Sequence, residues 1–519
     1  MSLKLYLKAI LSKAIKDLWN EETDIIPLEY PEFKQYGDYA TPVAMILARK
    51  LKKNPKEIAN SLVEYLKNYP ELNKIEIAGP GYINFFISDS FLNQEIKKII
   101  EDENYGKNNS LDGKKILLEY VSANPTGPLH VGHGRWAAIG DSLSRLLKFC
   151  GADVTREFYI NDAGIQVKLF YESVEAVKSG RPIPENGYHG EYIKEIASME
   201  GDPLLNMIAE QQSTLSKFRV QFDNYFSEKN LHISGAVQRV LEYLKKSGHG
   251  YESEGAFWFK STDFGDDKDR VLVKSDGDYT YFAVDIAYHR DKIRRGFDQL
   301  INVLGADHHG YTGRLKAAVR VMAEEAAREV ELVILIGQLV SLFRNGEPVR
   351  MSKRTGEMIT LEELIDEIGV DAARYYLVMR KADTPLEFDI EEAKKQSEDN
   401  PVFYVQYAHA RICSILRNAD VTAISVPEEI IDSPEAREIA IELVKFEEVL
   451  VDAARAFEPH RIPLYLENLA SVLHRFYNKH RVISEDKERT LKRLSLVMAT
   501  GRIIKKGLDL IGVSAPEKM

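Results

Sequence analysis

The chain has 519 residues, which is too many for a single hydrophobic core, so we expect three or four domains. Its composition, 44% hydrophobic and 29% charged, is that of a globular protein. There is no run of about 18 apolar residues, which excludes a membrane-spanning helix and predicts no membrane partner. The net charge of −11 by itself argues against nucleic-acid binding.

Residues 1–108 are predicted to form a small α+β domain. The first 19 residues place apolar side chains at helical spacing with lysines between them and lack a cleavage site. This pattern predicts a structural helix and not a signal peptide, so we expect a cytoplasmic protein. The apolar segments 75–78 and 82–87 flank a Gly-Pro-Gly turn and predict two strands. The polar segment 105–110 is interpreted as a linker.

Residues 109–345 are predicted to form a Rossmann-like domain with a parallel sheet. An apolar strand at 115–121, a helix from His130 to Cys150 and a strand at 154–160 make the strand–helix–strand unit of such a sheet. The polar segment around 185–260 is predicted to be an insertion. Further strands are predicted at 257–259, 271–273, 279–284 and 300–304.

The last third of the chain is predicted to be mostly helical. Residues 346–399 are assigned to a polar loop and connecting helices, and residues 400–519 to an all-α helical bundle, because their apolar residues recur at helical spacing. From Val472 onward, eleven lysines and arginines face five acids, which suits contact with phosphates at this end or an ordinary solvated helix face. The fold class is therefore multidomain α/β, with an N-terminal α+β domain and a C-terminal helical bundle. The two cysteines, Cys150 and Cys413, form neither a disulfide framework nor a metal knuckle and are predicted to be buried packing residues.

The segment 122–133, Ser-Ala-Asn-Pro-Thr-Gly-Pro-Leu-His-Val-Gly-His, connects the first strand and first helix of the α/β domain. Sheets of this kind bind nucleotides at such a place, and the helix start offers amide groups and a positive dipole to phosphate. Gly132 would let a flat ring approach the backbone, and His130 and His133 could donate hydrogen bonds to phosphate oxygens. Two surface histidines, or a metal pair at this spacing, are the alternatives.

A second polar segment, Arg350-Met351-Ser352-Lys353-Arg354-Thr355-Gly356, lies far downstream. A mobile loop that carries a lysine could close on the β- and γ-phosphates and neutralise the leaving pyrophosphate. In this order the two segments resemble the HIGH and KMSKS motifs of class I aminoacyl-tRNA synthetases. Arg350 and Arg354 depart from the second motif, whereas Lys353 matches its central lysine.

A narrower resemblance, to the arginyl-tRNA synthetase family, runs through nearly the whole chain. The segments that carry it are 37–41, 119–128, 155–164, 281–290, 304–309, 371–374 and 404–411. The first of them implies an extra N-terminal domain that contacts the tRNA elbow. Asp371-Ala372-Ala373-Arg374 is similar to the D-A-L-R motif that precedes an anticodon-binding bundle.

The resemblance implies an arginine site, an ATP site and a tRNA surface. The arginine-binding residues are Glu119, Ser122, Asn124, Glu228, Tyr281 and Asp285. The ATP-binding residues are His130, Gly132, His133, His309, Met351, Ser352 and Lys353, of which His130, His133 and Lys353 are catalytic. The candidates for contact with tRNA are Tyr404, Tyr407, Arg411 and Arg475.

Chemistry supports the choice of arginine, because a planar guanidinium with five donors favours a fork of carboxylates such as Asp285 and Glu228. The family implies ATP with Mg²⁺ as cofactor and arginine, ATP and tRNA(Arg) as partners, and we expect a monomer without zinc. Three alternatives stay open: another class I synthetase, a tRNA-binding paralogue without catalysis, and a metal hydrolase that uses His130, His133, His308 and His309.

Overall fold

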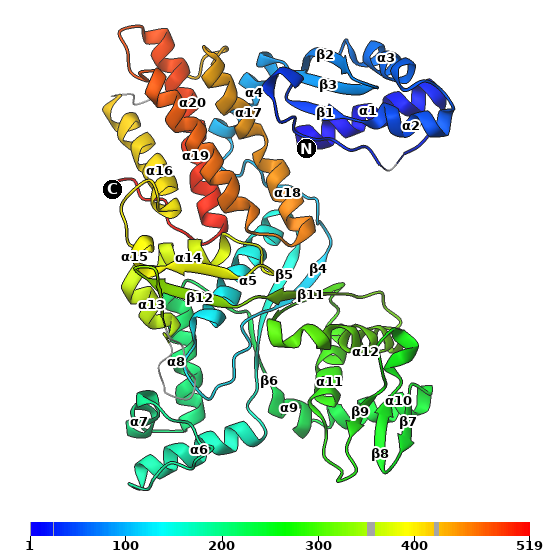
Figure 1. Ribbon diagram of the computed structural model, residues 1–519, viewed down its shortest axis with the longest axis vertical. Helices are drawn as coiled ribbons and strands as arrows, with labels where there is room; N and C mark the ends of the chain where they lie inside the picture. Colours follow the sequence, from blue (N-terminus) through cyan, green and yellow to red (C-terminus); the bar gives the residue numbers. More distant parts are fainter. Residues whose placement is uncertain (1, 24, 350–358, 420–424) are drawn as a thin grey trace.

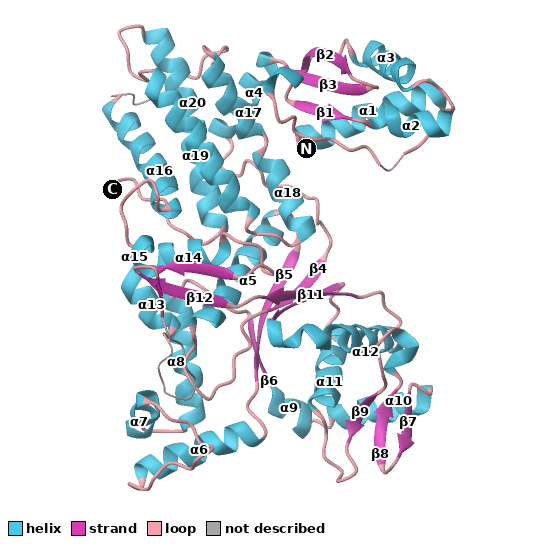
Figure 2. Ribbon diagram, viewed as in Figure 1, coloured by secondary structure: helices cyan, strands magenta, loops and turns pink. Residues whose placement is uncertain are grey.

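A computed structural model describes residues 2–23, 25–349, 359–419 and 425–519. Its centre is a sheet of five parallel strands (Figures 1 and 2). The strands are β4 (Lys115–Glu119), β5 (Asp153–Ile160), β6 (Asn224–Ser227), β10 (Gln299–Gly305) and β11 (Glu331–Gly337). The order β11-β10-β4-β5-β6 means that the chain builds the sheet outward from β4 in one direction and then returns to the other side. The switch point lies at the carboxyl ends of β4 and β10, where open α/β sheets bind ligands.

The strands of this sheet are connected by helices, not all of which pack against it. These helices are α5 (Val131–Phe149), α6 (Ile165–Lys178), α7 (Glu191–Ser198), α8 (Pro203–Lys217), α9 (Glu228–Ile233), α10 (Ala236–Ser247), α11 (Tyr281–Arg294) and α12 (Thr312–Glu325). The predicted helix from His130 to Cys150 is confirmed as α5. The predicted insertion around 185–260 supplies β6, so part of it belongs to the central sheet.

The predicted strand at 279–284 is wrong, because this segment begins α11. The side chain of Thr280 accepts a hydrogen bond from the amide of Ala283 and caps the helix. The predicted strands at 257–259 and 271–273 exist, but they belong to a separate antiparallel sheet. It consists of β7 (Gly250–Ser253), β8 (Ala256–Phe259) and β9 (Arg270–Val273).

After β11 the chain forms a small mixed sheet with short helices. Its elements are β12 (Val340–Arg344), β13 (Glu347–Pro348), α13 (Leu361–Ile368), α14 (Val370–Val378), β14 (Leu386–Asp389) and α15 (Ile390–Ala393). The central strand β12 pairs with β13 and β14.

The N-terminal part is an α+β unit, as predicted. It contains α1 (Leu3–Trp19), α2 (Val43–Leu51), α3 (Pro55–Leu66), α4 (Asp89–Glu101) and an antiparallel sheet of β1 (Tyr39–Thr41), β2 (Leu72–Ala78) and β3 (Tyr82–Ile87). The two predicted strands around the Gly-Pro-Gly turn are β2 and β3.

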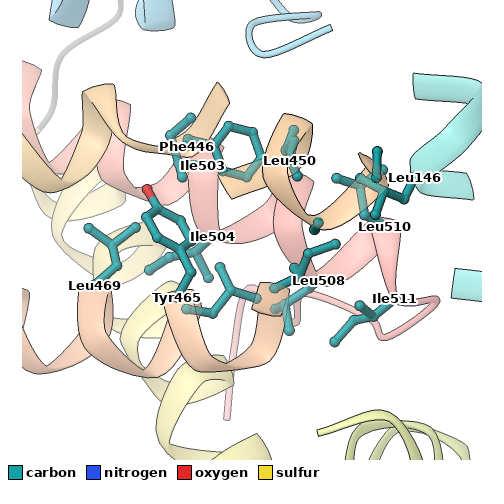
Figure 3. Close-up of a cluster of buried hydrophobic side chains, with 14 of the residues drawn as sticks. Leu146, Phe446, Leu450, Tyr465, Leu469, Ile503, Ile504, Leu508, Leu510 and Ile511 are labelled. Atoms are coloured by element: carbon teal, nitrogen blue, oxygen red, sulfur yellow. The ribbon is translucent and has the colours of Figure 1, made fainter. Parts of the chain in front are cut away.

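The C-terminal part is the predicted bundle, made of α16 (Pro401–Asn418), α17 (Pro434–Val444), α18 (Phe446–Ala456), α19 (Arg461–Lys479) and α20 (Lys487–Leu510). Buried side chains of α18, α19 and α20 gather in one cluster with Leu146 of α5 (Figure 3). The helix that starts at the sheet's switch point therefore shares a hydrophobic core with the bundle. Cys150 is buried as predicted, whereas Cys413 on α16 is only half-buried.

The N-terminal unit lies against the bundle (Figure 1). The buried carboxylate of Glu448 on α18 accepts hydrogen bonds from the Tyr39 hydroxyl (2.8 Å), the Tyr30 hydroxyl and the Lys4 amide (2.7 Å). On α17, Arg437 forms two bonds to the carboxylate of Asp38. Polar contacts of this density fix the orientation of the N-terminal unit on the bundle.

Candidate functional site

The segment after β4 is held in a strained turn. The backbone of Val121 has φ 69° and that of Ser122 has φ 42°, and this left-handed conformation is rare for a β-branched residue. The Ser122 hydroxyl donates to Oε1 of Glu119 (3.0 Å) and accepts from the Tyr159 amide (3.1 Å). Strain of about 1–3 kcal/mol per residue persists where the surroundings enforce it, and such places are frequently functional.

His130 and His133 form a stacked pair at the start of α5. Their ring centroids lie 3.6 Å apart. Nδ1 of His130 accepts hydrogen bonds from the amides of Gly132 (3.1 Å) and His133 (3.4 Å), while Nδ1 of His133 accepts from the amide of His130 (3.2 Å). Because Nδ1 is the acceptor in both rings, the neutral imidazoles carry their proton on Nε2. Both can therefore present an N–H donor to an anion.

This geometry corrects the prediction that the first amides of the helix are available to phosphate. The amides of Gly132 and His133 are already bonded to the His130 ring, so the donors at this helix start are the imidazoles. The structure also gives Gly132 a role in holding that ring. A Cβ at this position would lie 2.9 Å from Cε1 and 3.0 Å from Nδ1 of His130.

The three predicted acids come from three elements and meet at the carboxyl end of the sheet. Glu119 ends β4, Glu228 begins α9 and Asp285 lies in the second turn of α11. Glu119 and Glu228 are buried, and Asp285 is half-buried. The pKa of Asp285 is raised to about 7, mainly by burial. The negative charges of Glu119 and Glu228 also raise this pKa, whereas the hydrogen bond from Tyr311 lowers it. The three carboxylates therefore lie close enough to repel one another, as in a site built for a cation.

Two tyrosines that the sequence analysis did not select hold these acids. The Tyr159 hydroxyl donates to Oε2 of Glu228 (2.7 Å), and the Tyr311 hydroxyl donates to Oδ2 of Asp285. Burial and the charges of Glu228, Asp285 and Glu119 raise the pKa of Tyr159, so it stays a donor. Tyr159 lies inside the segment 155–164 that carries the family resemblance, which was the available signal for it. Tyr311 follows the His308-His309 pair and had no signal of its own.

The other predicted arginine-binding residues lie around the acids. Ser122 contacts Glu119 directly. Tyr281 begins α11 one helical turn before Asp285, and its side chain is 68% exposed. Asn124 is also exposed and donates to Oε1 of Gln166 on α6 (2.8 Å). These two residues therefore lie on the solvent side of the site.

Part of the predicted ATP site falls outside the described residues. Met351, Ser352 and Lys353 lie in 350–358, and the side chains of His308 and His309 are not described either. The chain that follows this segment is tied to the histidine pair. Thr360 forms an antiparallel bridge with His130, and the amide of Leu361 donates to the carbonyl of Leu129 (2.7 Å).

Three of the four tRNA candidates gather between α16 and α19. The rings of Tyr404 and Tyr407 lie 4.8 Å and 6.1 Å from the ring of His474. Arg411 lies over the ring of Tyr477 (5.3 Å). Arg475 does not join them, because it forms an ion pair with Glu438 of α17 (2.5 Å).

Within the described residues, no three His, Cys, Asp or Glu side chains are grouped so as to hold a metal ion. No helix in the described part of the chain combines the length and apolar character needed to cross a membrane.

Three family models match consecutive parts of the chain. They are an arginyl tRNA synthetase N terminal domain (residues 5–87), a catalytic domain of tRNA synthetases class I (R) (residues 95–182 and 197–411) and a DALR anticodon binding domain (residues 405–519).

Relatives match over the full length of the chain. The arginine–tRNA ligase 1 of Halalkalibacterium halodurans is 46% identical over 100% of this chain and 99% of its own. The arginine–tRNA ligase of Bacillus subtilis is 45% identical over 96% of each. The solved structure of Thermus thermophilus arginyl-tRNA synthetase is 23% identical and covers 100% of both chains with a TM-score of 0.83, a likeness of fold.

Proposed function

This chain belongs to the arginyl-tRNA synthetase family and is an arginine–tRNA ligase, and on that premise we propose how its residues activate arginine with ATP and transfer it to tRNA(Arg). One observation carries the assignment of the site. Glu119, Glu228 and Asp285 converge at the carboxyl end of the sheet, and the loop that follows Glu119 leads to the histidine pair.

Asp285 and Glu228 bind the guanidinium group of arginine. Their tyrosine partners, Tyr311 and Tyr159, each hold one oxygen of these carboxylates, and the second oxygen of Glu228 lies 3.6 Å from Nε2 of His232. Each charge-assisted hydrogen bond contributes about 1.5–3 kcal/mol. A neutral analogue would leave buried acids without a partner, so selection needs no separate editing step. Ser122 and Asn124 lie toward the α-amino end, and Tyr281 covers the guanidinium from the solvent side.

His130 and His133 stabilise the triphosphate as the arginine carboxylate attacks the α-phosphorus and pyrophosphate leaves. Their Nε2–H groups donate to phosphate oxygens on which negative charge develops. Gly132 keeps the His130 ring in place, and His309 lies on the adenylate side. Mg²⁺ bound by the phosphates would supply further charge neutralisation.

Lys353 completes this step from the segment that follows β13, together with Met351 and Ser352. Support comes from the bridge between Thr360 and His130. Lys353 precedes Thr360 by seven residues, so even a fully extended chain keeps its Cα within about 25 Å of Thr360, the residue that is bridged to His130. The long lysine side chain adds to this reach.

In the second step the terminal ribose hydroxyl of tRNA(Arg) takes the arginyl group from the adenylate. We propose that the N-terminal unit and the bundle hold the tRNA, with Tyr404, Tyr407 and Arg411 on the anticodon side. Arg475 is a weaker candidate because Glu438 already neutralises its charge. The monomeric state, the cytoplasmic location and the absence of zinc stay predictions from the sequence.

The test is to charge total tRNA with each of the twenty labelled amino acids in the presence of ATP and Mg²⁺. Arginine alone should give a labelled product, and Lys353→Ala should reduce its rate at least tenfold. Charging with another amino acid would favour a different class I synthetase, and no charging at all would favour a tRNA-binding paralogue. A hydrolytic activity of the purified protein that depends on a bound metal ion would favour the metal hydrolase alternative.

A further inference from the structure

Lys292 on α11 has no solvent-exposed side-chain area. It follows Asp285 by seven residues, or two helical turns, so both side chains project from the same face of the helix. Lysine is almost never fully buried without a partner, because its ammonium group loses its hydration. The burial of this lysine beside the acids therefore calls for a role in the site.

The ammonium group of Lys292 is held on three sides. It donates to Oε2 of Glu119 (2.5 Å) and to Oδ1 of Asn302 on β10 (3.2 Å), and it lies 4.1 Å from the centroid of the Tyr288 ring. Glu119 ends β4 and Asn302 lies on the neighbouring strand. One cation thus joins α11 to the two strands at the switch point.

Glu119 also holds the strained turn at Val121 and Ser122. Its second oxygen, Oε1, accepts from the Ser122 hydroxyl (3.0 Å), which in turn accepts from the Tyr159 amide (3.1 Å). Both carboxylate oxygens of Glu119 are therefore fixed, one by Lys292 and the other by Ser122. Without the lysine, the carboxylate would lose its counter-ion and its orientation together.

Asn302 is itself oriented by a neutral histidine. Nδ2 of Asn302 lies 2.9 Å from Nε2 of His289, and Nδ1 of His289 lies 2.8 Å from the carbonyl oxygen of Asp285. Burial lowers the pKa of His289, so its ring is uncharged; Nδ1–H donates to the carbonyl and Nε2 accepts from the amide. The amide oxygen of Asn302 is thereby directed at Lys292. The chain of hydrogen bonds thus ends at the backbone carbonyl of Asp285, the residue that faces the guanidinium.

We infer that Lys292 is a positioning residue for arginine recognition. It fixes Glu119 and the Ser122 turn, and it cancels one of three carboxylate charges so that two remain for the cationic groups of the amino acid. This inference rests on the proposed function, because it takes the acids to be the arginine site.

The test is Lys292→Met, which keeps an unbranched buried side chain but removes the charge. In charging assays with tRNA(Arg), the KM for arginine should rise at least tenfold, while the KM for ATP should change less than twofold. The matched control is Arg290→Met on the same helix. Arg290 is buried and its carboxylate partner is Glu325 (2.6 Å), which is not one of the three acids, so its loss should lower the melting temperature without changing the KM for arginine.

A second variant keeps the test decisive if Lys292→Met does not fold. Asn302→Leu keeps the size of the side chain and the ion pair between Lys292 and Glu119 but removes the amide oxygen that directs the ammonium group, so it should fold and raise the KM for arginine about threefold or more. A normal KM in the variant that folds would overturn the inference, and so would an equal rise for Arg290→Met. Wild-type protein that charges no arginine would instead overturn the proposed function.

Discussion

Nη2 of Arg374 lies 2.6 Å from Oδ2 of Asp141, and neither side chain is accessible to solvent. Asp141 lies on α5, the helix that begins at the histidine pair, and Arg374 ends the Asp-Ala-Ala-Arg segment on α14. The same guanidinium donates to the carbonyls of Ile511 (2.9 Å), just after α20, and Phe218 (2.9 Å). One side chain thus joins the helix that begins at the histidine pair to the end of the bundle.

Arg374→Met should destabilise the protein by about 2–4 kcal/mol, because Asp141 then keeps only its ion pair with Arg145 and two carbonyls lose a charged donor. The midpoint of urea unfolding, followed by circular dichroism, measures this loss. Lys245→Met is the matched control. Lys245 pairs with Glu252, and both side chains are about two-thirds exposed. The free energy of unfolding should therefore fall by less than about 1 kcal/mol in this variant. Equal midpoints for the two variants would contradict the role of Arg374.

His133→Ala should reduce arginine-dependent ATP–pyrophosphate exchange by about 100-fold or more, because one donor to the charged transition state is lost. The affinity for tRNA should stay within twofold of wild type, since His133 lies at the sheet and not on the bundle. Exchange with tRNA present and filter binding measure the two quantities. His189→Ala, in an exposed loop, should leave both unchanged.

Asp285 predicts a pH dependence of arginine binding. Its pKa of about 7 means that the carboxylate must lose a proton before it can pair with guanidinium in the unliganded enzyme. The KM for arginine should therefore rise about tenfold for each pH unit below 7. Asp285→Asn should raise the KM by about 10–100-fold at pH 8, the loss of one charge-assisted bond, and should abolish this slope. A wild-type slope in the variant would assign the titration to another group.

The same residue predicts an opposite effect on stability. The pKa of Asp285 is higher in the folded protein, at about 7, than its ordinary value of 3.8, so the folded state holds the proton more tightly. Its contribution to stability is present at low pH and is lost as the pH rises from about 4 to about 7. Without arginine, Asp285→Asn should therefore melt at a higher temperature than wild type at pH 8. At pH 4 the variant and the wild type should have the same melting temperature.

The sequence was sufficient for the elements with strong patterns and insufficient for the contacts that join them. The apolar run 115–121 predicted a buried strand, which is confirmed at 115–119, and the segment from Ser122 to His133 predicted a nucleotide-binding loop after it. The segment 279–284 is rich in aromatic and β-branched residues and was therefore predicted to be a strand. The segment is helical because Thr280 caps α11 and because α11 is packed on its neighbours. Such tertiary contacts often override the local preference for a strand.

Lys292 shows why part of the site could not be predicted. In the sequence it is one of several basic residues near the end of a helix, where lysines are common and usually exposed. Its partner Glu119 is 173 residues away, and only the pairing of β4 with β10 brings them together. The capping of α5 by the His130 ring was missed for a related reason, because histidine is not a usual cap residue.

The docking of the N-terminal unit on the bundle gives a prediction for tRNA. Arg437 forms two bonds to Asp38 (3.0 and 2.8 Å), one to Asp89 (2.9 Å) and one to the carbonyl of Ile87 (2.7 Å). Arg437→Met removes all four and leaves the contacts of Glu448 and the packing of α4 against the bundle, so the orientation of the N-terminal unit should become less fixed. If that unit and the bundle hold one tRNA together, as proposed, the KM for tRNA(Arg) should rise by about 3–10-fold, because the tRNA must then restore the alignment.

The control for this prediction lies at the same interface. Lys34 pairs with Glu438 of the bundle, but its side chain is 80% exposed, and such pairs contribute little because water and salt screen them. Lys34→Met should therefore leave the KM for tRNA within twofold, and neither variant should change the KM for arginine. If Arg437→Met also left the KM for tRNA unchanged, the two units would have to bind the tRNA independently, and their fixed orientation would serve stability alone.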